Sequence, residues 1–190
     1  MIIKVLDVTY DVTEAVDYYN TVNTVEYQSL TWFAKDESNN DLSISKVRGW
    51  AIQYPNNHIS GPYNMAWGWD ILDPKLYRNS EIAFGFSKKI LTIFPLAVRA
   101  FIYVNPPGTH FQPHIDTTKV FRIHIPIISN PDASWITEEG ITNMIPGNAY
   151  LVDTSFTHET INAGTSDRVH IELEMRREDI HTISNLSIRI

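Results

Sequence analysis

Cysteine is absent from all 190 residues of the sequence. Disulfide bonds and thiolate metal sites are therefore excluded, and histidine and carboxylate side chains are the ligand types left for a metal. A chain without cysteine also suits a reducing compartment. We expect a cytoplasmic protein in which any metal is bound through nitrogen and oxygen atoms.

Basic charge is scarce as well. The sequence has 15 Lys and Arg against 22 Asp and Glu, a formal net charge of -7. No run of Lys and Arg forms a local basic patch, and a surface of this charge repels a phosphate backbone. Nucleic acid is therefore not expected as a partner.

Long hydrophobic runs are missing too. The longest apolar region, residues 90–104, is interrupted by Pro95 and Arg99 and is too short for a membrane span. Residues 1–7 contain no apolar run that leads to a small-residue cleavage site, so they do not resemble a signal peptide. The sequence predicts a soluble intracellular protein without a membrane partner.

What is present is typical of a globular protein rich in β-structure. Hydrophobic residues make up 43% and charged residues 19%, while 12% of the residues are aromatic and ten are proline. These proportions argue against disorder and favour strands. A length of 190 residues predicts one domain over residues 1–190 with a substantial core.

Residues 1–95 are expected to supply helices and a few strands that cover one face of a sheet. The patterns predict a strand over residues 2–8, a helix capped by Asp11 or Thr13, a strand over 47–54, and a helix that starts at residues 79–81 and ends at Pro95.

A turn-rich stretch, residues 55–64, leads into Trp67-Gly68-Trp69. Tyr63, Trp67 and Trp69 are candidates for a substrate lid, because aromatic loops can cover a pocket. The alternative is that these three side chains pack against the outside of the sheet.

After Pro95 the pattern changes to short β-type runs separated by turns. The predicted strands cover residues 97–104, 120–128, 134–136, 141–145, 149–152, 157–162 and 169–175. Many short strands at this spacing predict a double-sheet jelly roll or barrel, with the core over residues 96–178. Residues 179–190 are expected to form a tail or an edge strand.

A candidate metal site lies in this second half. His114 and Asp116 are two positions apart, and His158 follows about forty residues later. Two histidines and one carboxylate can occupy one face of a metal, as in non-heme Fe(II) oxygenases. Three octahedral positions then stay open for a bidentate 2-oxo acid and O₂. Arg168 offers a planar, permanently charged group for the far carboxylate of such a co-substrate.

Strand periodicity groups the remaining polar residues. Arg122 and His124 alternate with apolar residues, and a strand that buries its apolar face against a second sheet would direct both into the cavity. Residues 168–175 alternate in the same way. Periodicity alone does not say which face looks inward, and we take Glu172 and Glu174 to be a solvated strand face.

Other polar residues are assigned structural or supporting roles. His58, His170 and His181 are expected to be structural or surface histidines, since nothing convergent surrounds them in the sequence. His110 is either a partner that supports His114 or part of a structural turn. Asp153 and Thr154 precede His158 and are expected to orient it.

Several motifs in order give the chain a family resemblance. They are residues 107–110, His114-Ile115-Asp116, Arg122-Ile123-His124, the segment from Gly147 to His158, and Arg168. Residues 97–178 resemble the aspartyl/asparaginyl β-hydroxylase branch of the Fe(II)- and 2-oxoglutarate-dependent oxygenases, and the free-proline hydroxylases share the pattern. The resemblance implies a mainly β protein with flanking helices, built as a cupin-like double-stranded β-helix.

The same resemblance assigns roles to individual residues. It implies that His114, Asp116 and His158 bind iron and that Arg168 binds the distal carboxylate of 2-oxoglutarate. Some members of this branch lack the carboxylate ligand, but Asp116 is present here.

Further roles follow from the resemblance for residues near the ligands. His124 would hold the co-substrate near the metal, and Tyr103 would be a polar co-substrate contact. Arg122 would anchor a substrate carboxylate or contact the co-substrate.

The expected activity is hydroxylation of an amino acid, free or within a peptide, with conversion of 2-oxoglutarate and O₂ to succinate and CO₂. Ascorbate is expected to help keep the iron reduced. Two alternatives remain at this stage. A cupin-type metalloenzyme that does not use 2-oxoglutarate would not need Arg168 as a carboxylate ligand, and a jelly-roll binding module would not need the triad.

Overall fold

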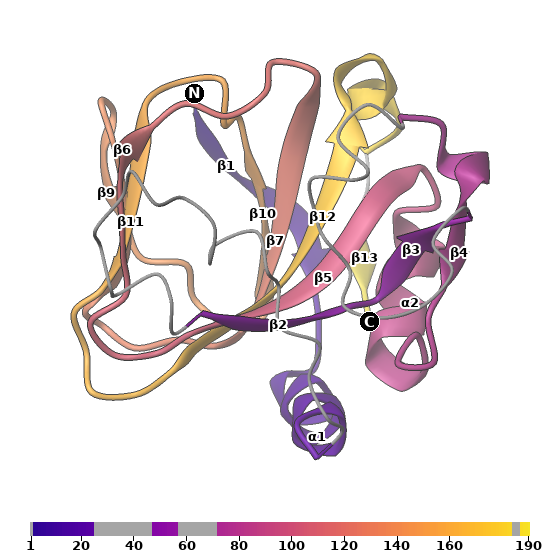
Figure 1. The fold of residues 1–190 in the computed structure, drawn as a ribbon, viewed down its shortest axis with the longest axis horizontal. Helices are drawn as coiled ribbons and strands as arrows, with labels where there is room; N and C mark the ends of the chain where they lie inside the picture. Colours follow the sequence, from indigo (N-terminus) through magenta and orange to yellow (C-terminus); the bar gives the residue numbers. More distant parts are fainter. Residues whose placement is uncertain (1, 25–46, 57–71, 184–186) are drawn as a thin grey trace.

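The computed structural model describes residues 2–24, 47–56, 72–183 and 187–190, and its elements are labelled in Figure 1. The strands are β1 (Ile3–Thr9), β2 (Arg48–Ala51), β3 (Gln53–Pro55), β4 (Tyr77–Asn79), β5 (Ala97–Asn105), β6 (His110–His114), β7 (Val120–Ile128), β8 (Ala133–Thr137), β9 (Gly140–Thr142), β10 (Asn148–Val152), β11 (His158–Asn162), β12 (Arg168–Arg176) and β13 (Ile188–Arg189). The helices are α1 (Val12–Val22), α2 (Gly85–Ile93) and the 3-10 helices η3 (Pro74–Leu76) and η4 (Arg177–Thr182).

Two sheets face each other (Figure 1). The larger has the strand order β13-β1-β10-β7-β12-β5-β2, and the smaller has the order β6-β11-β8-β9. Between β5 and β12, consecutive strands are divided over both sheets, and β10-β7-β12-β5 stands opposite β6-β11-β8-β9. This is the arrangement of a double-sheet jelly roll, so the predicted mainly β fold with flanking helices is confirmed.

The helices α1 and α2 cover the outer face of the larger sheet, and the main apolar core lies beneath them. Tyr18 and Tyr19 of α1 and Phe86 of α2 belong to one buried cluster with Ile125 of β7 and Ile171 of β12. Asp11 caps α1, accepting hydrogen bonds from the backbone N–H groups of the next turn. Burial of this cluster is the main source of stabilisation for the larger sheet.

The other face of the larger sheet is polar and faces the smaller sheet. Period-two alternation along β7 and β12 sends their apolar residues to the helices, so Arg122, His124, Arg168, His170, Glu172 and Glu174 share the inner face. The question that periodicity left open is thereby answered: the helices, and not a second sheet, cover the apolar face of β7. The functional residues lie inward nonetheless.

Several predicted boundaries need correction. Residues 47–54 form two strands, because the chain bends at Ile52 between pairing with β5 and pairing with β4. Residues 79–81 do not start α2, since Ser80 bonds to Ala51 O and Ile52 O and the helix begins at Gly85.

Two more differences concern the smaller sheet and the C-terminus. β6 was not predicted, and β9 covers only part of residues 141–145. Residues 188–189 add β13 parallel to β1 at the edge of the larger sheet, which corresponds to one of the two alternatives, a tail or an edge strand.

Tyr63, Trp67 and Trp69, the lid candidates, and His58 lie outside the described residues. Among the described residues, no helix is long and apolar enough to cross a membrane. The division into residues 1–95, 96–178 and 179–190 stays a prediction, although β1 and β2 join the same sheet as the C-terminal strands.

Candidate metal site

Two neighbouring strands bring the predicted ligands together. His114 ends β6, His158 begins β11, and the two residues are register partners in the smaller sheet. Asp116 follows β6, where its backbone N–H donates to Thr154 O at 2.9 Å. The donor atoms of His114, Asp116 and His158 all lie within 4.8 Å of one another. The site is therefore fixed by backbone pairing between β6 and β11.

The imidazoles present the correct nitrogen to a metal. His114 Nδ1 lies 2.6 Å from Gln112 O, and His158 Nδ1 lies 3.0 Å from Phe156 O. A carbonyl accepts a hydrogen bond, so each Nδ1 carries a proton, and in the neutral imidazole that binds a metal the lone pair is then on Nε2. His158 Nε2 lies 3.5 Å from Asp116 Oδ2, and His114 Nε2 lies 3.9 Å from Asp116 Oδ1.

The protonation states also suit a cation. Burial by itself would raise the pKa of Asp116, but Arg122 and the two histidines lower it to about 2. Burial lowers the pKa of His114. An ionised carboxylate and neutral imidazoles are the ligand forms that bind metal, so these three residues fit a divalent metal with open positions.

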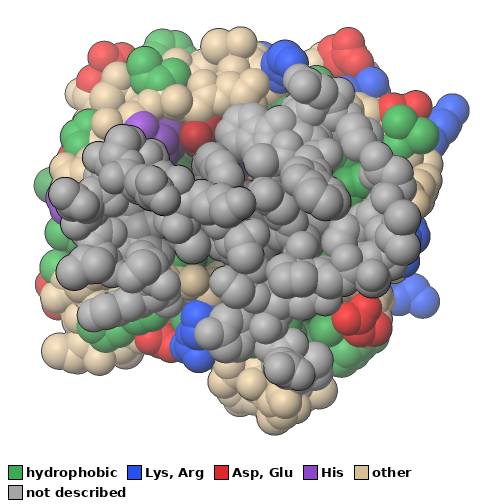
Figure 2. Space-filling model, viewed as in Figure 1, with side chains coloured by type: hydrophobic (Ala, Val, Ile, Leu, Met, Phe, Trp, Pro, Cys, Tyr) green, Lys and Arg blue, Asp and Glu red, His purple; other side chains and the backbone are tan. Residues whose placement is uncertain are grey.

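Figure 2 shows histidine atoms in purple beside acidic atoms in red at the upper left, next to the position of β6 and β11 in Figure 1. His114 is partly exposed, whereas His158 is only 1% exposed. The candidate site therefore lies near the surface at one end of the space between the sheets.

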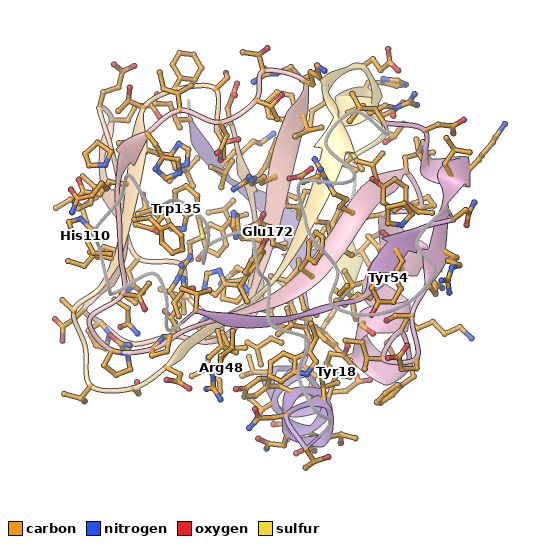
Figure 3. All side chains as sticks on the ribbon, in the orientation of Figure 1. Tyr18, Arg48, Tyr54, His110, Trp135 and Glu172 are labelled. Carbon is orange, nitrogen blue, oxygen red and sulfur yellow. The ribbon has the colours of Figure 1, made fainter. Side chains whose placement is uncertain are left out.

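Trp135 lies between the two sheets (Figure 3). Its ring stacks on His158, with centroids 5.1 Å apart and an interplanar angle of 20°. The same ring lies 5.0 Å from His124 and 6.0 Å from the guanidinium carbon of Arg168. Trp135 thus connects the triad with a second group of polar residues on the larger sheet.

That second group is Arg168, His170 and His124, which are all buried. Arg168 Nη2 lies 3.2 Å from His170 Nδ1, and the rings of His170 and His124 are 5.7 Å apart. His170 Nε2 and both ring nitrogens of His124 are buried without a hydrogen bond among the described residues. Buried polar atoms of this kind need partners, and an anionic group between them would supply some.

The group of Arg168, His170 and His124 has a positive charge. Burial lowers the pKa of Arg168 to about 10, so it stays protonated at neutral pH. Burial and the nearby Arg168 lower the pKa values of His124 and His170 well below the usual range, so both rings are neutral. Arg168 is therefore the cation of this group, and the two histidines contribute hydrogen-bonding atoms.

A third group of buried charges lies farther along β7 and β12. Arg122 Nη1 is 2.9 Å from Asp116 Oδ2, and Arg122 Nε is 3.3 Å from Glu172 Oε1 and 3.6 Å from Glu174 Oε1. Arg99 donates hydrogen bonds to Glu174 Oε2 through Nε and Nη2. The pKa of Arg122 is raised by these carboxylates despite burial, so the guanidinium is always charged.

Tyr103 lies beside these charges on β5. It is the register partner of His170 and shares the inner face with that residue. Burial and the charge of Glu172 raise its pKa well above the usual range, so the phenol is neutral. The structure thus places Tyr103, Arg122 and His124 on the inner face of the larger sheet, while their assigned roles stay predictions.

The expectation of a solvated face for Glu172 and Glu174 is wrong. Both are buried, at 6% and 2% exposure, because the polar face of β12 looks toward the smaller sheet. His170 does have convergent neighbours, contrary to the sequence interpretation. The burial of these residues could have been inferred from Arg168. If Arg168 points inward, strand alternation requires residues 170, 172 and 174 to point inward too.

Trp135 and Arg99 were also missed. Trp135 belongs to a short run on the opposite sheet, and no local pattern links it to His158. In the sequence, Arg99 stood out only as an interruption of the apolar region 90–104. In the structure its side chain is 1% exposed and forms an ion pair with Glu174.

The remaining polar candidates lie around the site. His110 contacts Glu159 across β6 and β11, and Figure 3 places it on the outer side of the smaller sheet. His181 is exposed and bonds to Glu178 O. Asp153 bonds to Ser155 and Arg177, which ties down the turn before His158. Thr154 supports Asp116 through its carbonyl.

Comparisons with known proteins place this site in a family context. Residues 86–178 match the model of the aspartyl/asparaginyl beta-hydroxylase family, which confirms the resemblance noted in the sequence. This segment contains all three ligand candidates and Arg168. No match to a curated protein was found.

Solved structures show only distant similarity. An oxidoreductase of the 2OG-Fe(II) oxygenase family from Burkholderia pseudomallei is 10% identical, with a TM-score of 0.47 over 67% of this chain and 65% of that chain. A cupin domain from Bordetella pertussis Tohama I is 21% identical, with a TM-score of 0.35 over 41% of this chain and 80% of that one. A predicted oxalate decarboxylase from Thermotoga maritima is 16% identical, with a TM-score of 0.36 over 48% and 76% of the two chains.

Proposed function

We propose, from the match of residues 86–178 to the aspartyl/asparaginyl beta-hydroxylase family, that the protein is an Fe(II)- and 2-oxoglutarate-dependent hydroxylase of an amino acid, free or within a peptide. The observation that carries the proposal is the convergence of His114, Asp116 and His158 in a space that also holds Arg168. The family match supports a hydroxylase, and the donor set supports iron.

In this proposal His114, Asp116 and His158 hold the iron, which supplies the oxidative chemistry when bound. The hydrogen bonds from Nδ1 of both histidines to backbone carbonyls keep each Nε2 available. Arg122 keeps Asp116 ionised and oriented. These contacts prepare the ligands before any metal arrives.

Arg168 would bind the distal carboxylate of 2-oxoglutarate. It is buried and cationic, and its contact with His170 leaves further N–H groups of the guanidinium for a ligand. His124 would contribute a ring nitrogen to the same co-substrate, since both nitrogens lack a hydrogen bond among the described residues. Trp135 would exclude water between the carboxylate pocket and the triad.

Arg122 retains its predicted role as a contact for a substrate carboxylate or the co-substrate, and Tyr103 retains its role as a polar co-substrate contact. Ascorbate would keep the iron in the Fe(II) state. A cytoplasmic location is proposed from the composition alone.

The proposal is tested by following succinate formation by NMR. Protein, Fe(II), ascorbate and 2-oxoglutarate are incubated in air, with and without pools of amino acids and peptides. We expect succinate in wild type, more of it when a substrate is present, and none in His158→Ala. Absence of succinate in every condition, with no stabilisation by metal and 2-oxoglutarate, contradicts the proposal.

A further inference from the structure

Glu172 is a buried carboxylate without a hydrogen-bonded partner. The residue is 6% exposed, and its Oε1 makes no hydrogen bond among the described residues. It belongs to the inner face of β12 and lies in the space between the sheets (Figure 3). A carboxylate in such a place is costly unless a cation or a donor compensates it.

The nearby arginines leave Glu172 Oε1 without a hydrogen bond. Arg99 gives two hydrogen bonds to Glu174. Arg122 Nη1 contacts Asp116 at 2.9 Å, and its Nε approaches Glu172 Oε1 at 3.3 Å without a hydrogen bond on either atom.

The two other possible donors, Arg168 and His124, make no hydrogen bond to Glu172 either. Arg168 bonds to His170 and, in the proposed function, takes the co-substrate carboxylate. His124 Nε2 lies 3.8 Å from Glu172 Oε2, too far for a hydrogen bond. Glu172 thus lies within ion-pair distance of Arg122, but its Oε1 accepts no hydrogen bond among the described residues and can still take a donor.

Aromatic rings line the same region. Phe101 is the register partner of Glu172 and Tyr103 is the partner of His170, so both rings share the inner face. Their centroids are 5.9 Å apart, and Phe101 is 1% exposed. Aromatic rings beside a carboxylate favour an organic cation over a metal ion or an anion.

We propose that Glu172 binds a cationic group of the substrate, an ammonium or a guanidinium, and so selects substrates that carry a positive charge near the hydroxylated position. The inference rests on the proposed function, because it places the substrate in the space beside the triad. The cation has two possible sources with the same chemistry. It is the α-ammonium of a free amino acid or the side chain of Lys or Arg in a peptide.

The test measures binding by calorimetry without oxygen, on protein loaded with Fe(II) and 2-oxoglutarate. One set of probes compares free L-amino acids with their N-acetyl forms, which lack the α-ammonium. A second set compares acetyl-lysine amide with acetyl-norleucine amide, and acetyl-arginine amide with acetyl-citrulline amide. The first set detects a free amino acid, and the second detects a cationic side chain.

In wild type, we expect the cationic member of at least one pair to bind at least tenfold more tightly. Glu172→Gln should reduce this preference at least tenfold, while 2-oxoglutarate affinity changes less than twofold. Glu178→Gln, which alters an exposed carboxylate, is the matched control and should behave as wild type. If Glu172→Gln does not fold by circular dichroism, Glu172→Met replaces it, since an apolar side chain of similar volume suits a buried site.

A wild type without preference in any pair, or a preference that survives in the neutral variant, overturns the inference. Succinate formation is measured in parallel to separate the two proposals. Succinate without a Glu172-dependent preference removes the cation site and keeps the oxygenase. A Glu172-dependent preference without succinate in any condition keeps the cation site and removes the oxygenase.

Discussion

Arg168 donates a hydrogen bond from Nη2 to Nδ1 of His170 at 3.2 Å, deep in the space between the two sheets. An arginine is only a donor, so His170 Nδ1 must accept and the proton must lie on Nε2. That Nε2–H is buried and has no hydrogen-bond partner among the described residues. Arg168 therefore fixes the tautomer in which His170 presents a donor beside the proposed carboxylate pocket.

Two substitutions separate the roles of the two ring nitrogens of His170. His170→Gln keeps a donor near Nε2 and loses the acceptor at Nδ1, whereas His170→Asn keeps an acceptor near Nδ1 and loses the distant donor. We expect 2-oxoglutarate to bind His170→Asn more weakly than His170→Gln, by about 1 kcal/mol, the scale of one hydrogen bond. Calorimetry on the metal-loaded protein measures this difference, and the reverse order would show that support of Arg168 matters more than the donor.

Arg168→Lys tests the carboxylate pocket itself. Lysine retains the charge but lacks the planar fork, so it cannot bind a carboxylate through two parallel hydrogen bonds. The affinity for 2-oxoglutarate should fall by about 2 to 5 kcal/mol in Arg168→Ala and by less in Arg168→Lys. Affinity for the metal alone should stay the same in both variants. An unchanged affinity for 2-oxoglutarate would remove Arg168 from the pocket.

The Arg99–Glu174 pair should matter mainly for stability. Both side chains are at most 2% exposed, so Glu174→Gln leaves a buried guanidinium without its counter-ion. We expect the free energy of unfolding to fall by about 3 to 5 kcal/mol. Glu14→Gln disrupts the exposed Lys89–Glu14 pair and should cost at most about 1 kcal/mol. Urea unfolding of both variants measures the two losses, and equal losses would contradict the role assigned to burial.

Stability should also depend on pH through Glu172. Burial raises its pKa from 4.5 to about 7, against the lowering effect of Arg122 and with a further rise from Glu174. The charged or titratable neighbours are Arg122, His124, Arg168, Glu174, Asp116 and Tyr103. Because the pKa of Glu172 is higher in the folded than in the unfolded state, the protonated carboxyl stabilises the folded protein. This contribution is complete below pH 4.5 and is lost as the pH rises through 7.

The matching experiment compares wild type with Glu172→Gln in metal-free urea unfolding between pH 5 and pH 8. Glutamine does not titrate, so the variant should gain about 2 to 3 kcal/mol relative to wild type over this range. His124 and His170 are present in both proteins, so their titration largely cancels in the difference. Parallel stability curves would show that Glu172 is ionised in the folded protein already at pH 5.

Much of the fold was predictable because strand alternation is a local property. The boundaries of β5, β7 and β12 agree with the sequence prediction to within a residue at each end. β6 was missed, since Pro113 and its polar neighbours suggest a turn. Its position at the edge of the smaller sheet explains the exception, because proline is tolerated on edge strands.

The metal ligands were predictable from the sequence, because their spacing forms a recognisable motif. His114, Asp116 and His158 were identified from spacing and resemblance, and the structure brings their donor atoms together. Trp135 could not be identified, because its contact with His158 depends on pairing between β8 and β11. Glu172 was assigned to the wrong face, since charged residues are rarely buried without a partner.

Metal-dependent binding of 2-oxoglutarate is the decisive property of the proposed site. Fe(II) and then 2-oxoglutarate are titrated without oxygen into wild type, His158→Ala and Arg168→Ala, and binding is followed by calorimetry. We expect one metal site per chain in wild type, 2-oxoglutarate binding that requires the metal, loss of both in His158→Ala, and loss of 2-oxoglutarate alone in Arg168→Ala. Metal binding that is unchanged in His158→Ala, or 2-oxoglutarate binding that ignores the metal, would contradict the proposed site.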